Sequence, residues 1–596
     1  MARNRYDEDE VLEEKFDFRQ VMRLLRYVRP YKKKVALTLF VMLSSAFLAT
    51  FIPKLFQLEM DECIPNGDIR GIVFLALITA VICLYIVLCI RWKIKLTVSL
   101  GQDMIYQLRE DLFYHLQELP FSYYDERPHG KIQVRVVNYV NNLSDVLSNG
   151  ILQTVTDCFN LIFIIIFMVS MSPHLALICL CGIPVLLIVV FFIKKFQRRA
   201  WQIQSNKQSN LNAYIAESIN GIRVTQAFVR EEENTKIFNN LSQSYRNAWM
   251  VASYYGFAMG PTVDLISTVT TSLVYVLGVN YILYGGIQGV SVGILVAFTA
   301  YISRFWQPIN TIANFYNSVV TSVSYLERIF ETIDEPVEVK DAEDAVEMPE
   351  IKGDVAFSHV NFSYEDGVQI LRDVSFEAKA GQRIAFVGPT GAGKSTIVNL
   401  ISRFYNVDSG VVSVDGQDIS KVTLHSLRSQ MGVMMQDSFI FGGTIMDNIR
   451  YGNKTATDEE VIRAAKTVCA HDFIMQMEDG YETEVNERGS RLSQGQRQLI
   501  SFARALLADP SILILDEATS SIDTETEILV QKGLDELLKG RTSFIIAHRL
   551  STIIDADCIM YIDNGGIVES GTHEELLSQK GKYYDLVKAQ GIGIFE

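Results

Sequence analysis

The sequence predicts an all-α membrane domain of six transmembrane helices with long cytoplasmic extensions, followed by an α/β P-loop domain. Three observations predict this fold class. Apolar runs near the roughly 20 residues that a helix needs to cross a bilayer occur only in about the first 330 residues. After them, short β-rich runs alternate with helical stretches, as in α/β folds. A complete glycine-rich phosphate-binding motif lies in this second part.

The size and composition exclude several broad classes of protein. The 596 residues are too many for one compact core, and 49% of them are hydrophobic, which excludes a disordered chain. The formal net charge of −15 argues against a general nucleic-acid binder. The eight cysteines lie mostly in apolar runs and form no CxxC pair, so neither a disulfide framework nor a structural zinc site is expected.

Six apolar runs are predicted to span the bilayer. Ser172-Pro173 separates the third run from the fourth, because proline disfavours helix at the residue before it. Gly285-Gly286 separates the fifth from the sixth. A stretch at about 18–31 has apolar residues at helical spacing and is predicted to be an interfacial elbow helix. The predicted spans cover about 35–57, 71–92, 151–171, 174–194, 258–284 and 293–316.

Lysine and arginine residues predict the orientation of these spans. Lys32–Lys34 precede the first span and two further lysines, at 194–195, follow the fourth, whereas the opposite loops carry acids such as Asp61. The positive-inside rule then places both termini in the cytoplasm. No signal peptide is visible, and the acidic stretch at 7–14 is opposite in character to a mitochondrial transit peptide. We therefore expect a multi-pass protein of a bacterial cytoplasmic membrane.

The long connections between spans predict helices that continue beyond the membrane. Polar and apolar residues recur at helical spacing in the connections at about 93–150 and 195–257. An acidic stretch at 331–350 contains Pro336 and Pro349 and is predicted to be an irregular linker. The expected domains are thus a transmembrane domain at 1–330, this linker, and an α/β P-loop nucleotide-binding domain at 351–596.

The segment Gly388–Thr396 matches the P-loop pattern and lies between a predicted strand at 384–387 and a predicted helix at 396–404. Its glycines allow backbone N–H groups to close around phosphate at a helix N-terminus. We expect Lys394 to reach the β- and γ-phosphates and Ser395 to ligate Mg²⁺. A chance glycine-rich turn is the alternative, and the intact Gly-Lys-Ser at a strand–helix junction argues against it. The candidate nucleotide-binding residues of this loop are Gly388, Thr390, Gly391, Gly393, Lys394, Ser395 and Thr396.

A second apolar strand, at 511–515, ends in the two acids Asp516 and Glu517. Asp516 suits a Mg²⁺ ligand, and Glu517 is placed to polarise an attacking water as general base. Two solvated acids at a strand end are the alternative interpretation. The intact P-loop in the same domain favours the catalytic interpretation.

Further motifs resemble those of ATP-binding-cassette (ABC) proteins. Leu492-Ser-Gln-Gly-Gln496 resembles their signature motif, and the segment 516–523 resembles their Walker B and D-loop. Ile546-Ala-His548 resembles the switch histidine, Met435-Gln436-Asp437 the Q-loop, and Phe362-Ser-Tyr364 the aromatic loop. The segment 483–489 resembles a loop that faces the intracellular helices in exporters. Six spans followed by one such domain resemble a half-transporter of the multidrug and lipid exporter (B-type, type IV) subfamily.

This resemblance implies that ATP is hydrolysed with Mg²⁺ at a composite site between two nucleotide-binding domains. It implies that Tyr364 stacks on adenine and that the signature residues grip a γ-phosphate bound to the other domain. Because the chain has one P-loop and one signature segment, we expect an obligate dimer with a second half-transporter in the lipid bilayer. The implied catalytic residues are Glu517, His548 and Gln436, the metal ligands Ser395, Gln436 and Asp516, and the further nucleotide contacts Ser493, Gly495, Gln496 and Asp523.

Two departures from the family pattern bear on the partner. Gln494 stands where the family usually has glycine, and Asn486 stands where glycine is common. With this glutamine, the signature segment resembles that of the catalytically complete member of heterodimeric pairs. A heterodimer is therefore slightly favoured, and a homodimer is the alternative. The family's short coupling helices resemble the stretches Arg135–Tyr139 and Gln226–Glu231.

The resemblance implies ATP-driven export of amphipathic small molecules or lipids by alternating access. A lipid flippase and a peptide exporter are alternatives, and a non-transporting ATP-gated sensor or regulator is an alternative of another class. The intact Glu517 and His548 argue against the last. Asp264 either attracts a cationic amphiphile or pairs with Arg304, and the aromatic residues of the sixth span either line a pocket or pack in the bundle. The polar residues within predicted spans are Asp157, Asp264, Asn280, Arg304, Asn310 and Asn314.

Overall fold

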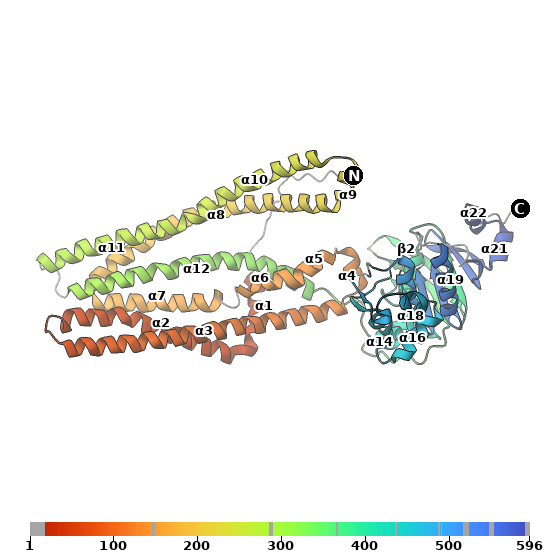
Figure 1. The fold of residues 1–596 in the computed structure, drawn as a ribbon, viewed down its shortest axis with the longest axis horizontal. Coiled ribbons are helices and arrows are strands. Elements are labelled where there is room, and N and C mark those ends of the chain that lie inside the picture. Colours follow the sequence, from red (N-terminus) through yellow and green to blue (C-terminus); the bar gives the residue numbers. More distant parts are fainter. Residues whose placement is uncertain are drawn as a thin grey trace. The chain divides into compact units, whose positions relative to one another are not determined.

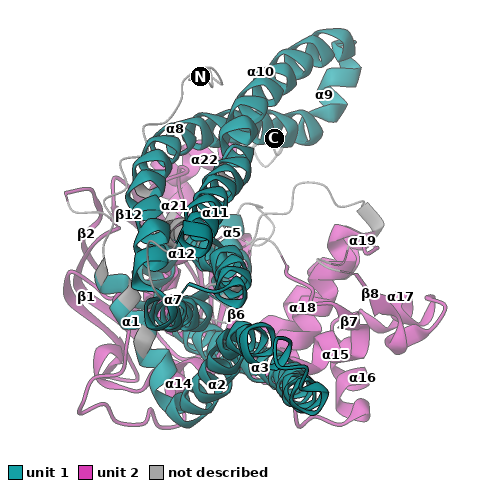
Figure 2. Cartoon of the chain, turned by 90° about the vertical axis from the view of Figure 1, so that its left-hand side faces the viewer, with its two compact units in different colours: residues 1–117, 130–334 teal, residues 118–129, 335–596 magenta. Residues whose placement is uncertain are grey.

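The computed structural model describes residues 18–127, 129–145, 150–284, 290–364, 367–435, 438–486, 489, 491–516, 524–546 and 553–589. The chain divides into two compact units (Figure 2). Residues 1–117 and 130–334 form the first unit, and residues 118–129 and 335–596 form the second. The second unit therefore contains a short piece of the first long loop, which the sequence analysis assigned to the membrane domain.

The first unit is a bundle of long helices (Figure 1). Helices α3 and α8 contain 50 and 48 residues, far more than the roughly 20 that cross a bilayer, as predicted for helices with long extensions. The helices that form this unit or border it are α1 (Phe18–Val28), α2 (Lys32–Leu58), α3 (Ile69–Glu118), α5 (His129–Val134), α6 (Val140–Asp145), α7 (Ile151–Met171), α8 (Pro173–Asn220), α9 (Ile222–Ala227), α10 (Glu231–Phe257), α11 (Met259–Tyr284) and α12 (Val292–Ile333).

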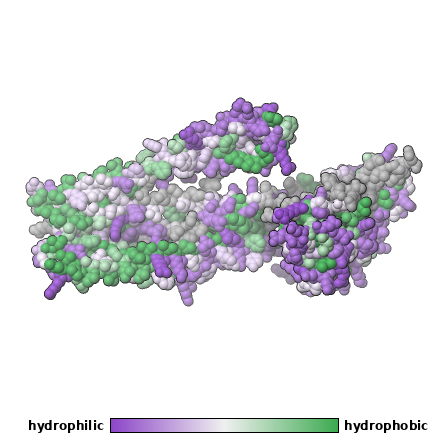
Figure 3. Space-filling view, in the orientation of Figure 1, coloured by the Kyte–Doolittle hydropathy of each residue, from purple (hydrophilic) through white to green (hydrophobic). Residues whose placement is uncertain are grey.

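Among the described residues, five helical segments are long and apolar enough to cross a membrane, and they contain α2, α3, α7, α8 and α11. The sixth predicted span falls on α12, which carries the polar residues Ser303, Arg304 and Gln307. Apolar side chains cover much of the visible surface of α2, α3 and α11, whereas the surface of the second unit is mainly hydrophilic (Figure 3). The distribution fits a unit that lies in lipid and a unit that lies in water.

Helix α12 has two different faces. Its buried face carries Phe298, Tyr301, Phe305 and Trp306, which are 0–3% exposed and pack against α7, α8 and α11. Of the two interpretations of these aromatic residues, the structure supports packing within the bundle for these four and not the lining of an open pocket. The polar Ser303, Arg304 and Gln307 lie on the other, exposed face.

Two polar contacts join the membrane helices at the residues that the sequence singled out. Arg304 donates from Nη1 to the carbonyl oxygen of Ala49 in α2 at 2.5 Å, and Asp264 is exposed on α11. In the described structure Arg304 thus bonds to α2 rather than to Asp264. The buried Asp157 accepts from Gln153 at 2.8 Å, and Gln153 accepts from Lys93 of α3 at 2.6 Å.

A carboxylate joins the end of α2 to the start of α12. Asp61 lies in the π-helical turn η2 (Glu59–Cys63) that continues α2. It accepts from the hydroxyl of Ser291 at 2.5 Å, from the N–H of Gly293 at 2.9 Å and from the side chain of Gln57 at 2.8 Å. A Cβ on Gly293 would lie 2.6 Å from an Asp61 oxygen, so any larger residue at this position would displace the carboxylate.

The second unit contains a six-stranded sheet with the order β12-β11-β3-β10-β9-β6. Its strands from β11 to β6 pair in parallel, and β12 is antiparallel to β11. Ile512 and Ile514 of β9 join one core, and Leu513 and Leu515 join the core on the other face. Successive side chains of a strand point to opposite sides, so this alternation shows that both faces of the sheet are buried, as is usual for parallel sheets. The strands are β3 (Arg383–Val387), β6 (Met431–Met434), β9 (Ile512–Asp516), β10 (Thr542–Ile546), β11 (Cys558–Asp563) and β12 (Gly566–Gly571).

A smaller antiparallel sheet has the order β2-β1-β4-β5, and β7 pairs with β8. Its strands are β1 (Val355–Ser363), β2 (Gln369–Ala378), β4 (Ser409–Val414) and β5 (Gln417–Asp418), and the short pair is β7 (Gly443–Thr444) and β8 (Glu484–Val485). The helices of the unit are α4 (Phe121–Glu126), α13 (Lys394–Ile401), α14 (Leu424–Arg428), α15 (Ile445–Arg450), α16 (Asp458–Thr467), α17 (His471–Met475), α18 (Gln494–Ala508), α19 (Thr524–Leu538), α21 (His573–Gln579) and α22 (Lys582–Ala589).

The predicted linker at 331–350 begins within α12, and its residues from 334 on form no helix or strand, as the composition suggests. Helix α12 continues to Ile333, and the residues after it are fixed to the second unit by hydrogen bonds. Asn406 donates to the carbonyl of Glu338 at 3.0 Å, Arg403 donates to that of Lys340 at 3.0 Å, and Asp341 accepts from a backbone N–H of α14 at 2.7 Å. The linker therefore belongs to the surface of the second unit.

Candidate nucleotide-binding site

Four of the predicted motifs follow adjacent parallel strands. Strand β3 leads directly into the P-loop, β10 ends two residues before His548, β9 ends at Asp516, and β6 ends two residues before Gln436. Because β3, β10, β9 and β6 are neighbours and run in parallel, their carboxyl ends share one edge of the sheet. Ligands of open α/β sheets bind at this kind of edge.

The P-loop glycines adopt conformations that other residues disfavour. Gly388 has φ of 138°, and a Cβ there would lie 2.1 Å from the carbonyl oxygen of Ile562. Gly393 has φ of 107° and precedes α13, which no side chain caps at this end. Uncapped N–H groups at a helix start can bind a phosphate, and the helix dipole adds to the attraction. The backbone therefore fits the predicted anion site, with Gly391 (φ 81°) and Thr390 in the loop between.

Lys394 supplies a buried positive charge inside the loop. Its side chain donates to the carbonyl oxygens of Gly388 at 2.9 Å and Pro389 at 2.8 Å, and the residue is 7% exposed. Burial lowers the pKa of Lys394, and the carboxylate of Asp516 acts in the opposite direction. An anionic ligand would favour the charged ammonium further. Ser395 is exposed beside it. The hydroxyl of Ser395 and the carboxylate of Asp516 are hard oxygen donors, the kind of ligand that Mg²⁺ prefers.

Tyr364 presents a ring next to the P-loop helix. It is 42% exposed, and its hydroxyl lies 3.1 Å from the hydroxyl of Thr396 in α13. Phe362 and Tyr405 support the ring in edge-on contacts, with centroid distances of 4.8 and 5.1 Å. A supported, half-exposed aromatic ring beside a phosphate loop can stack on a base.

The signature segment forms the capped start of α18. The hydroxyl oxygen of Ser493 accepts from the N–H of Gln496 at 3.2 Å, and the side-chain oxygen of Gln496 accepts from the N–H of Ser493 at 2.9 Å. Gly495 is buried in the first turn, and Gln494, which departs from the family pattern, is its first residue. The cap uses a lone pair of Ser493 and leaves its O–H hydrogen able to donate.

The other predicted residues of the site lie outside the described part of the chain. They are Gln436, Glu517, Asp523 and His548. Their roles stay predictions. Gln436, Glu517 and His548 each follow within two residues of a strand that ends at the same edge of the sheet, which agrees with these roles.

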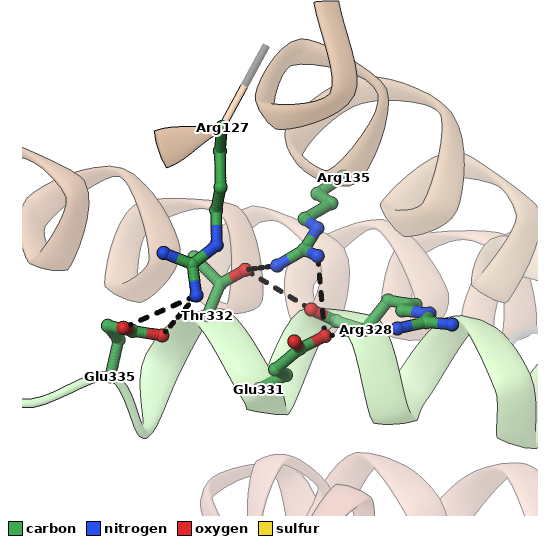
Figure 4. A network of polar contacts seen from close by, with 6 residues as sticks. All are labelled: Arg127, Arg135, Arg328, Glu331, Thr332 and Glu335. Atoms are coloured by element: carbon green, nitrogen blue, oxygen red, sulfur yellow. Dashed lines mark hydrogen bonds and ion pairs between the residues drawn. The ribbon is translucent and has the colours of Figure 1, made fainter. Parts of the chain in front are cut away.

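The structure adds a contact that the sequence analysis did not predict. In the second unit, the ring of Phe121 lies 4.4 Å from that of Phe404, and Tyr405 donates to Asp125. Figure 4 shows a third contact, in which Arg127 pairs with Glu335 at 3.2 Å. The segment 118–129 is thus the part of the first loop that packs on this unit. An aromatic run directly after Pro120, at the end of a 50-residue helix, was the available signal.

The stretch that the resemblance suggested for this contact lies elsewhere. Arg135–Tyr139 forms the π-helical turn η3 in the first unit. Arg135 donates to the hydroxyl of Thr332 at 2.8 Å and pairs with Glu331 at 3.3 Å, both in α12 (Figure 4). This turn therefore holds α12 within its own unit.

Comparison with known proteins identifies the family. Residues 35–309 match the family of the ABC transporter transmembrane region, and residues 371–520 match the ABC transporter family. The chain belongs to the ABC transporters. It is 42% identical to an uncharacterised ABC transporter ATP-binding protein, YknV, of Bacillus subtilis (strain 168), over 98% of this chain and 97% of that protein. It is 40% identical to a fatty acid ABC transporter ATP-binding/permease protein of Mycobacterium tuberculosis (strain CDC 1551 / Oshkosh), over 78% and 73%.

The fold of this ABC transporter is also that of a solved exporter. The structure of a bacterial Atm1-family ABC exporter with ATP bound has a TM-score of 0.78 to this chain, with 28% identity, and covers 96% of this chain and 99% of that one. The comparisons confirm the predicted fold class and the half-transporter resemblance. The chain is an ABC exporter half-transporter that binds ATP and couples an ATPase to transport.

Proposed function

We propose that the chain is one half of a dimeric exporter that moves amphipathic small molecules, such as drugs or lipids, across a bacterial cytoplasmic membrane. The observation that carries the proposal is the sheet edge where the P-loop, with its buried Lys394, adjoins Asp516. This edge belongs to a chain whose first unit is a membrane helix bundle. Both termini then lie in the cytoplasm, as the charge distribution predicts.

In the proposed ATPase site each residue has a chemical role. Lys394 and backbone N–H groups of the P-loop bind the phosphates, and Tyr364 stacks on the adenine. Ser395, Asp516 and Gln436 would hold Mg²⁺. Mg²⁺ would neutralise charge on the phosphate oxygens during hydrolysis. Glu517 polarises the attacking water, while His548, with Gln436, contacts it or the γ-phosphate. Gly495, Gln496 and Asp523 complete the contacts from a second chain.

Dimer formation follows from the signature segment. Ser493 donates its O–H hydrogen to the γ-phosphate held by the P-loop of the other chain, so one chain cannot complete a site. The cap at the start of α18 supports this role, because it fixes the hydroxyl and the first N–H groups of the helix. Gln494 favours a second, different half-transporter as the partner, and a second copy is the alternative.

Two exposed apolar surfaces support the proposal that the chain binds a partner chain. The first is the α9 tip, which comprises Ile219, Ile222, Val224, Phe228 and Val229, exposed by 47–80%. The second is an aromatic cluster of Phe439, Phe441 and Tyr451, which surrounds the guanidinium of Arg504 at 5.4–5.6 Å from two of the rings. We propose that the α9 tip of one chain packs on the aromatic cluster of the other, since clustered apolar side chains exposed to water mark interaction sites.

The exposed face of α12 supports the proposal that the transported substrate is amphipathic. Ser303, Arg304 and Gln307 recur along this face, and such residues are costly in lipid, so they face a water-filled cavity or a partner. The guanidinium of Arg304 has further N–H donors beside the one given to Ala49. An acidic headgroup, such as a carboxylate or phosphate, is the group that these donors would bind.

The test is vanadate-sensitive ATP turnover and substrate efflux by this chain in lipid nanodiscs and proteoliposomes. Turnover that Glu517→Gln abolishes, with efflux of a lipid or dye, supports a homodimeric exporter. A folded, ATP-binding chain without turnover supports a heterodimer when a co-expressed half-transporter restores it. Turnover with no efflux of any amphiphile would favour a non-transporting regulator, and turnover that Glu517→Gln leaves unchanged would contradict the proposed site.

A further inference from the structure

Tyr405 touches both the predicted base-stacking ring and the first-loop segment. Its ring contacts that of Tyr364 edge-on, with centroids 5.1 Å apart and an interplanar angle of 85°. It also contacts Phe362 at 5.7 Å. Its hydroxyl donates to the carboxylate of Asp125 in α4. One side chain, 9% exposed, therefore links the edge of the nucleotide site to a segment attached to the membrane helices.

The backbone that carries Tyr405 is held in place. The preceding residue, Phe404, donates its N–H to Asn399 of α13 at 2.9 Å. Arg403 is 4% exposed and donates to two carbonyl oxygens, those of Val422 and Lys340, each at 3.0 Å. Because the backbone here is bonded to the P-loop helix and to the linker, we expect the side chain of Tyr405 to move and its backbone to stay in place.

The other anchors of α4 contact different parts of the unit. Phe121 packs on Phe404, which lies under the guanidinium of Arg428 in α14 at 5.1 Å. Arg127 pairs with Glu335 of the linker. These contacts hold α4 on the unit, whereas the contact through Tyr405 also reaches the ring of Tyr364. The chain continues from α3 into α4 through two residues, and α5 follows three residues after it.

We propose that Tyr405 is a positioning residue that transmits occupancy of the adenine site to α4. The inference rests on the proposed function, in which Tyr364 stacks on adenine. A base that fixes the ring of Tyr364 also fixes the Tyr405 ring against which it packs, and thereby the hydroxyl that binds Asp125. The response of α4 then depends on the base and not on the phosphates alone.

The experiment measures backbone hydrogen exchange of residues 118–127 in the full chain in nanodiscs, with its partner chain where one is required. A slowly hydrolysed ATP analogue should slow this exchange about tenfold, the lower end of the range for one hydrogen bond to a charged group, and inorganic tripolyphosphate should change it little. Tyr405→Phe keeps the ring contact and removes the hydroxyl. We expect it to bind the analogue as the wild type does but to lose the exchange response.

Two further variants separate transmission from simple docking. Asp125→Ala should lose the response as Tyr405→Phe does, and the double variant should lose no more than either alone, because both remove one interaction. Asp125→Asn keeps an acceptor oxygen and should retain part of the response. Phe404→Leu should speed exchange with and without nucleotide by a similar factor and keep the difference between the two states.

The result that overturns the inference is a full response in Tyr405→Phe, or the same pattern in Tyr405→Phe as in Phe404→Leu. Failure of the proposed function gives a different result. If Tyr364→Ala binds the ATP analogue as tightly as the wild type does, Tyr364 does not stack on the base. If Tyr364→Ala weakens binding while Tyr405→Phe keeps the response, the base site stands and the transmission through Tyr405 fails.

Discussion

Replacing Ser493 with alanine tests whether the start of α18 does more than begin a helix. The hydroxyl of Ser493 closes a capping box with Gln496, and losing such a cap costs about 1 kcal/mol. For a unit of this size the midpoint of thermal unfolding should fall by about 2–4 °C. If the O–H also donates to a γ-phosphate, a bond to a charged group worth roughly 1.5–3 kcal/mol is lost as well. Its loss should lower kcat/KM for ATP by a further factor of about 10 to 150.

The same unit supplies matched controls. Thr457 caps α16 and Thr572 caps α21 with the same box, completed by Glu460 and Glu575. Thr457→Ala and Thr572→Ala should lower the unfolding midpoint as Ser493→Ala does and leave ATP turnover within about twofold of the wild type, since a lost cap costs stability alone. The assay is vanadate-sensitive turnover of the dimer in nanodiscs, measured beside thermal unfolding. Equal losses of turnover in all three variants would refute the reasoning, as would a Ser493→Ala variant with normal turnover.

Three other changes follow from the geometry. Gly388→Ala places a Cβ 2.1 Å from the carbonyl of Ile562 at a positive φ, so ATP analogue binding should weaken at least roughly tenfold; unchanged binding in a fluorescence titration would contradict the close approach. Burial lowers the pKa of Lys394 from 10.5, so the unfolded chain binds more protons and wild-type stability should rise as the pH increases through the lowered pKa toward 10.5. Lys394→Met should lack this alkaline gain in denaturant unfolding and should not bind ATP, and an identical pH profile would count against the buried charge. Asp61→Asn removes the negative charge and one of the two acceptor oxygens that bind Ser291 and Gly293, and it should speed amide exchange at the start of α12 about tenfold; an unaltered rate would show that this contact does not stabilise the start of α12.

The helix bundle could be predicted where local signals are strong. The predicted span at 151–171 coincides with α7, because Pro173 follows it and most of its residues are apolar. The helical continuation of α3 and α8 was also predicted from spacing. The faces of the helices could not be predicted in the same way. The aromatic residues of α12 suit a pocket or a packed core equally well, and the neighbours that bury Phe298 and Trp306 lie on α7, α8 and α11.

The candidate site was predictable because its residues are consecutive in the sequence. The P-loop and the start of α18 need only their own backbone to form, so Lys394 and Ser493 are found from local patterns. Tyr405 and Asp125 are 280 residues apart, and each alone is an ordinary polar residue near a helix end. The partner that gives them a role comes from the fold, which a local pattern does not encode. The linker shows the same effect, because its acidic composition predicted irregular chain and not its anchoring to Arg403.

The inclusion of 118–129 in the second unit has a consequence for biosynthesis. The ribosome completes α4 long before it makes the surface on which α4 packs, since Asp125 precedes Tyr405 by 280 residues. At about 5–20 residues per second, this interval lasts roughly 15–55 s. During that time the first loop has no docking surface from its own chain. The membrane bundle must therefore be inserted with this loop undocked, and the chain can close the contact only after the P-loop helix has been synthesised.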